Sequence, residues 1–137
     1  MELKKSYKGF AWWMIGFLAA IFAVAFIPAQ DEMMPMRLIM LVMAWGVASM
    51  AFLIWKTESV YWYNGTTYEE AVAAGRERRK EFARRHLVIF ARFALMATAV
   101  SCLTLLLPPL PLWLTLAIRL LAAAMMVTVA FRRRSWR

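Results

Sequence analysis

The chain has 137 residues, of which 64% are hydrophobic, and its formal net charge is +9. Ordinary soluble domains are about 45–50% apolar, and one core of this size would not bury the excess, which therefore indicates contact with lipid. One cysteine, Cys102, and one histidine, His86, exclude a disulfide framework and a metal site built from several cysteine and histidine ligands.

Four apolar segments approach the length of about 20 residues that a membrane-spanning helix needs. Lipid does not tolerate unpaired backbone polar groups, so each segment is predicted to be a helix. We find no internal repeat or low-complexity linker between them. The sequence therefore predicts an all-α polytopic membrane protein, with one domain over residues 1–137 that is a four-transmembrane-helix bundle. The predicted membrane helices cover residues 10–28, 38–55, 87–107 and 112–131.

The first segment has a second interpretation. Lys4 and Lys5, followed by an apolar run and the residues AVA at 23–25, are also typical of a cleavable signal peptide. The apolar run is longer than a usual signal core, and no clear small-residue cleavage site follows it. We therefore favour an uncleaved first helix.

The connections differ in length. Pro35, in the first connection, suits the first turn of the helix that follows it. The prolines of residues 108–111 predict a tight antiparallel hairpin between the last two helices, whereas residues 56–86 form a long connection. Within it, Thr66 and Glu69 have capping-box spacing, as do Thr67 and Glu70. We predict a helix from about Thr67 that extends towards the third membrane helix, with Gly75 as a weak point.

Positive charge is distributed unevenly. Of the 17 lysines and arginines, three precede the first membrane helix, seven lie in residues 56–86 and four follow the last helix. By the positive-inside rule, both termini and the connection 56–86 are predicted to be cytoplasmic. The expected location is the cell (inner) membrane of a prokaryote, because the chain is small and carries no other targeting signal.

Arg119 lies near the middle of the fourth segment, where an arginine costs about 2.5–3.5 kcal/mol on insertion scales. None of the four segments contains Asp or Glu. Folding the last two helices about their prolines puts Arg119 level with Ser101, and Thr115 lies one turn away on the same face as Arg119. We predict that Arg119, Ser101 and Thr115 bind an anion or a partner. The alternative is that Arg119 only packs or snorkels.

A second basic group lies in the connection 56–86. Its members are predicted to bind anionic lipid headgroups or an acidic partner, and the alternative is that they only set topology. No nucleic-acid-binding motif accompanies them. Residues 60–63, VYWY, are predicted to lie at headgroup level or to cover the cytoplasmic end of the bundle. The basic group consists of Arg76, Arg78, Arg79, Lys80, Arg84 and Arg85.

The chain lacks the usual signals of catalysis and coupled transport. It has no acidic residue in the membrane segments for proton coupling, no catalytic carboxylate pair, no phosphate-binding glycine loop and no CxxC motif. We expect no enzymatic activity, no cofactor and no metal. Ser101 with Arg119 acting on a lipid is the one enzymatic alternative.

Three functions remain open. The leading hypothesis is an accessory or interaction subunit of a membrane complex, with membrane lipids and a membrane protein as partners. The alternatives are a homo-oligomeric anion channel or carrier with Arg119 in its path, and an anionic-lipid-binding protein.

Overall fold

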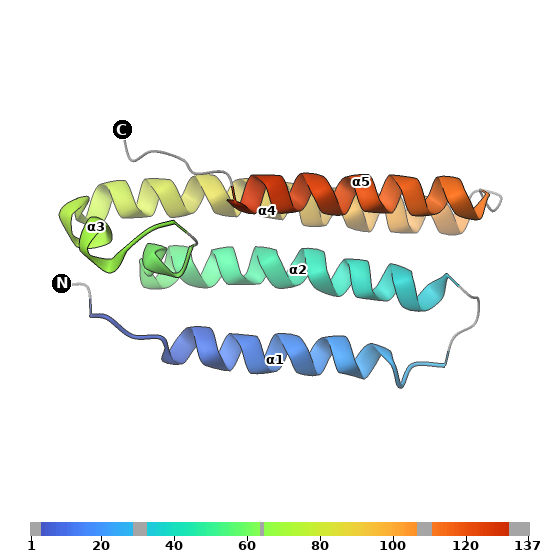
Figure 1. The fold of residues 1–137 in the computed structure, drawn as a ribbon, viewed down its shortest axis with the longest axis horizontal. Helices are drawn as coiled ribbons and strands as arrows, with labels where there is room; N and C mark the ends of the chain where they lie inside the picture. The colour runs from blue at the N-terminus through green and yellow to red at the C-terminus, as the bar shows by residue number, and fades with distance from the viewer. Residues whose placement is uncertain (1–3, 29–32, 64, 107–110, 132–137) are drawn as a thin grey trace.

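The computed structural model describes residues 4–28, 33–63, 65–106 and 111–131. These residues form helices and short connections only, which confirms the all-α prediction. Figure 1 shows the four longest helices lying lengthwise beside one another, with α3 at one end. In chain order the elements are α1 (Lys8–Val24), α2 (Met34–Thr57), the 3-10 turn η1 (Val60–Trp62), α3 (Tyr68–Ala73), α4 (Gly75–Leu106) and α5 (Leu112–Phe131).

Two of these helices, α2 and α4, are long and apolar enough to cross a membrane. The 24 residues of α2 correspond to about 36 Å of helix, which exceeds the hydrocarbon thickness of about 30 Å. The apolar α1 is shorter, with 17 residues. The 20 residues of α5 coincide with the predicted segment 112–131.

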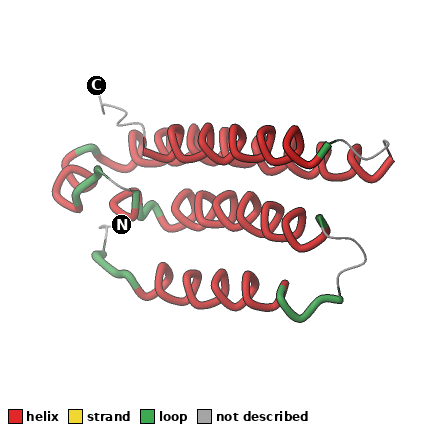
Figure 2. The backbone as a smooth tube through the Cα atoms, turned by 45° about the vertical axis from the view of Figure 1, so that its right-hand side comes forward, coloured by secondary structure: helices red, strands yellow, loops and turns green. Residues whose placement is uncertain are grey.

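The central contact joins α2 to α4, and α1 packs on another side of α2 (Figure 2). Residues at spacings of three and four share one helix face, and each helix buries such a face. Most of these buried residues are alanines, which let two helix backbones approach closely. The buried apolar positions are Ala44, Ala48, Ala51 and Ile54 on α2, and Ala83, Phe90 and Ala94 on α4.

The contact between α1 and α2 depends on a glycine. A Cβ atom added at Gly46 would lie 2.2 Å from the ring of Phe17, so only glycine leaves room for this ring. Phe17 also stacks on Trp13, with ring centroids 4.9 Å apart. The indole N–H of Trp13 donates to the Ser49 hydroxyl at 2.9 Å. Hence this aromatic pair of α1 contacts α2 twice, through Phe17 over Gly46 and through the hydrogen bond from Trp13 to Ser49.

Large apolar side chains cover the outer surface of the helices. Trp12, Phe22, Trp113 and Leu120 are each between 68% and 73% exposed. Soluble monomers rarely expose continuous apolar surface of this kind. The outer surface is therefore suited to contact with lipid.

Candidate functional site

The structure turns sharply at the end of α2. Glu58 follows the helix with φ 59° and ψ 18°, in the left-handed region that glycine normally occupies. A non-glycine residue in this region carries a cost of about 1–2 kcal/mol. Such backbone strain persists where surrounding contacts hold it in place, and Glu58 makes several contacts of this kind.

The start of the following helix is as predicted. The Thr67 hydroxyl accepts a hydrogen bond from the Glu70 N–H at 3.2 Å, and the Glu70 carboxylate accepts one from the Thr67 N–H at 3.0 Å. This capping box begins α3. Gly75, with φ 74°, separates α3 from α4. From there α4 runs without interruption to Leu106, so the predicted helical extension and the third apolar segment are one helix.

Glu58 is surrounded by basic side chains from the first two turns of α4. Its carboxylate accepts hydrogen bonds from Arg76 Nε at 2.9 Å and from Arg79 Nη2 at 3.1 Å. Lys80 Nζ lies 3.9 Å away. The three cations share one helix face because they are three and four residues apart. Arg79 also donates from Nη1 to the Ala71 carbonyl at 3.1 Å, so this cluster joins α2, α3 and α4.

The cluster is partly removed from solvent. The side chains of Arg79 and Glu58 are 6% and 15% exposed. Desolvation raises the pKa of Glu58, but the hydrogen bonds and charges of Arg76 and Arg79 outweigh it and bring the pKa below its ordinary value of 4.5. Glu58 is therefore ionised at neutral pH. Arg79 Nε is buried and has no hydrogen-bond partner in the described structure.

These residues line a cleft of about 470 Å³. Five cationic side chains line it, and Glu58 is the one carboxylate among the lining residues. The cleft therefore carries a formal excess of positive charge. Its lining comprises Lys4, Ser6, Gly9, Lys56, Thr57, Glu58, Ser59, Trp62, Arg76, Arg79 and Lys80.

The aromatic residues of η1 hold the N-terminal side of the cleft. The Tyr61 hydroxyl accepts from the Ser6 N–H and donates to the Ser6 carbonyl, both at 2.9 Å. The Trp62 indole donates to the same carbonyl at 3.1 Å. A Cβ atom at Gly9 would lie 3.0 Å from the Trp62 ring, so this ring packs closely on the start of α1. Of the two placements predicted for residues 60–63, these contacts match the one in which they cover an end of the bundle.

The six basic residues predicted as one group have two kinds of surroundings. Arg76, Arg79 and Lys80 lie within 4 Å of Glu58 and line the cleft. Arg78, Arg84 and Arg85 are exposed and are not among the cleft residues. Arg85 forms an ion pair with Glu81, as its spacing of four residues favours.

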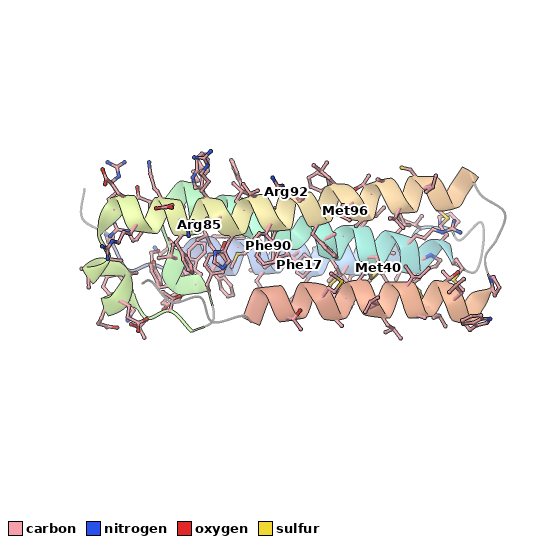
Figure 3. The ribbon with its side chains drawn as sticks, turned by 90° about the horizontal axis from the view of Figure 1, so that it is seen from above. Phe17, Met40, Arg85, Phe90, Arg92 and Met96 are labelled. Carbon is pink, nitrogen blue, oxygen red and sulfur yellow. The ribbon has the colours of Figure 1, made fainter. Side chains whose placement is uncertain are left out.

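Two of these arginines, Arg84 and Arg85, border a second depression on α4. Glu81, Arg84 and Arg85 line it together with Val88 and Ile89, and its volume is about 370 Å³. Arg92 is also exposed farther along α4, on the side away from the buried Phe90 (Figure 3). An exposed arginine therefore also lies within the apolar part of α4.

The residues predicted around Arg119 are only partly described. Ser101 lies in α4 and is half-buried. The Thr115 hydroxyl, in α5, donates to the Pro111 carbonyl at 3.3 Å. Arg119 belongs to α5, but its side chain lies outside the described residues. The site formed by Arg119, Ser101 and Thr115 therefore stays a prediction.

Sequence reasoning missed Glu58, Lys4 and Lys56 as site residues. Glu58 precedes Arg76 by 18 residues and Arg79 by 21, and no local spacing rule connects residues so far apart. The available signal was that Glu58 lies three residues after the end of the predicted apolar segment 38–55. Lys4 reaches the cleft because Tyr61 and Trp62 hold Ser6, a long-range contact with no sequence pattern.

Among the described residues, no group of three or more His, Cys, Asp and Glu side chains could hold a metal ion. No protein-family model, no curated protein and no solved structure matches the chain.

Proposed function

We propose that the protein spans a membrane four times, with both termini and the end that carries the Glu58 cluster on the cytoplasmic side. The lengths of α2 and α4 and the exposed apolar surface support this topology. The distribution of lysine and arginine supports the orientation. Arg37 lies at the opposite end of α2 from Lys56, and few basic residues accompany it there.

Site-directed labelling tests this topology. In a variant with Cys102→Ala, a single cysteine is placed either in the connection 28–33 or at Thr66. An impermeant maleimide should label the first cysteine in intact cells and the second only after the membrane is opened. Labelling of both from outside, or of neither, contradicts the four-span arrangement.

Within this topology, we propose that the protein is a non-enzymatic accessory subunit that binds an acidic partner through α4. The observation that carries this proposal is the set of exposed arginines Arg78, Arg84 and Arg85 on a helix that continues into the apolar segment. The Glu58 cluster ties the start of the same helix to α2, so the exposed arginines are presented on a fixed support. Complementary charge of this kind favours association and orients the partner.

Photo-crosslinking in native membranes tests this proposal. A photoreactive residue replaces Arg84, and the crosslinked peptide is identified. We expect a crosslink to an acidic segment of another membrane protein. Arg78→Gln with Arg84→Gln should weaken that association, and a charge reversal in the partner segment should weaken it further.

The matched control is Lys5→Gln with Lys8→Gln, which removes the same charge from exposed positions outside this set. It should leave the crosslink unchanged. A crosslink only to lipid or to other copies of this chain contradicts the proposal. A single native mass that is a multiple of 15.8 kDa would instead favour the homo-oligomeric channel.

A further inference from the structure

The cleft around Glu58 has more positive charge than its own carboxylate balances. Arg76, Arg79 and Lys80 lie within 4 Å of Glu58. Lys4 and Lys56 line the same cleft and have no carboxylate within that distance in the described structure. Two cations are therefore available to an anion that enters the cleft.

The buried arginine gives a second, independent indication. The Arg79 side chain is only 6% exposed, lines the cleft, and keeps its Nε atom without a hydrogen-bond partner among the described residues. A buried charged donor without an acceptor carries a desolvation cost. The Arg79 side chain is among the residues that line the cleft, and arginine is well suited to phosphate oxygens.

The position of the cleft at the end of α2 indicates how deep the cleft would lie in a membrane. Lys56 and Thr57 are the last residues of α2, directly after its apolar stretch, and both line the cleft. If α2 spans the membrane, this depth is that of the phospholipid phosphates. Trp62, also in the lining, belongs to a residue type that is enriched at the same level.

From these observations we propose that the cleft binds a phosphate group, with Lys4 and Lys56 as its primary cationic contacts and Arg76, Arg79 and Lys80 held in place by Glu58. The exposed arginines proposed to contact a partner, Arg78, Arg84 and Arg85, are not among the residues that line this cleft. Glu58 keeps the three α4 cations together in the absence of the anion. The phosphate belongs either to an anionic phospholipid or to a soluble phosphate compound.

Two binding measurements on the purified full-length protein distinguish these sources. In the first, native mass spectrometry follows a titration with phosphatidic acid, with phosphatidylcholine as the reference lipid. In the second, thermal unfolding in detergent is measured with inorganic phosphate and with chloride at the same ionic strength. Preferential retention of phosphatidic acid indicates the lipid, whereas stabilisation by phosphate alone indicates a soluble ligand.

Variants then locate the site. Lys4→Gln with Lys56→Gln should weaken the observed binding between about tenfold and about thirtyfold, because each basic residue near a membrane surface contributes on the order of 1 kcal/mol. Both lysines are exposed, so this variant should keep its fold. Lys5→Gln with Lys8→Gln removes the same charge from exposed positions that do not line the cleft and should bind as the wild type does.

Two results would overturn the proposal. One is the absence of both phosphatidic acid preference and phosphate stabilisation. The other is an equal loss of binding in the two double variants, because that result would indicate attraction by net charge without a defined site.

Discussion

The carboxylate of Glu58 and the guanidinium of Arg79 join the end of α2 to the start of α4 through a 3.1 Å hydrogen bond. Each residue of this pair lies four positions beyond a buried apolar residue: Glu58 comes after Ile54, and Arg79 comes before Ala83. The apolar contact between the two helices therefore ends at this ion pair. Removing the Glu58 carboxylate should change both the free energy of unfolding and its dependence on pH, and the two effects can be measured separately.

Removing the Glu58 carboxylate should destabilise the fold. In Glu58→Gln the buried Arg79 loses its counter-charge, and we expect a loss of about 2–3 kcal/mol, below the usual value for a fully buried pair because Glu58 keeps some contact with solvent. Reversible unfolding in detergent measures this loss. A value within about 0.5 kcal/mol of the wild type would show that the pair does not stabilise the fold.

The left-handed backbone at Glu58 gives a second comparison. Glu58→Ala and Glu58→Gly both remove the carboxylate, but glycine adopts this conformation without steric cost. We expect the glycine variant to be about 1 kcal/mol more stable than the alanine variant. Equal stabilities would mean that the positive φ at position 58 is not retained in solution.

The same pair predicts how stability changes with pH. The pKa of Glu58 is lowered below 4.5 in the folded state, so its contribution is fully present above that pH and is lost as the pH falls through the folded-state pKa. The difference in Tm between the wild type and Glu58→Gln should therefore shrink in acid. A difference that stays constant in acid would contradict this assignment.

Gly46 and Gly16 provide a matched test of the contact between α1 and α2. In Gly46→Ala the new methyl group would overlap the Phe17 ring, and we expect a loss of about 1–3 kcal/mol. No atom lies within 4 Å of a Cβ at Gly16, so Gly16→Ala should be neutral or stabilising by up to about 1 kcal/mol through helix propensity. Thermal unfolding compares the two variants, and similar losses in both would mean that Phe17 does not occupy the space over Gly46.

Two neighbouring tyrosines should respond in opposite ways to loss of the hydroxyl group. Tyr61→Phe removes two hydrogen bonds to Ser6 and should cost about 1–2 kcal/mol. The Tyr63 hydroxyl is buried without a partner in the described structure, and its burial raises the pKa of Tyr63. Tyr63→Phe should therefore be neutral or stabilising by about 1 kcal/mol.

Hydrogen exchange gives a second readout for this pair. Amide exchange in residues 4–7 should increase in Tyr61→Phe and stay unchanged in Tyr63→Phe. Faster exchange in both variants would mean that the aromatic packing, not the Tyr61 hydroxyl, holds this segment.

The helices were predictable because their signals are local. Apolar length identified the segment 112–131, which is α5, and the spacing of Thr67 and Glu70 identified the capping box. Apolar length gave less exact bounds where a helix continues into charged sequence, since α4 begins 12 residues before the predicted segment at 87. Hydropathy reports the part of a helix that suits lipid, whereas hydrogen bonding continues beyond it.

The site was predictable only in part because it combines distant segments. The six basic residues were predicted as one group, but which of them face Glu58 depends on which face of α4 packs against α2. Glu58 joins them through a backbone conformation that its residue type does not favour. Small alanines along α2 and α4 determined the packing face, and those residues were too common in the sequence to single out.

The pairing of Glu58 with Arg79 also restricts how the two longest helices can assemble. A shift of α4 by one residue moves it by about 1.5 Å and turns it by about 100°, which would separate Arg79 from Glu58. In the proposed four-span topology, α2 enters the membrane before α4. Glu58 then selects the depth and rotation at which the later helix can dock, so that a mis-inserted chain is penalised by an unpaired buried charge.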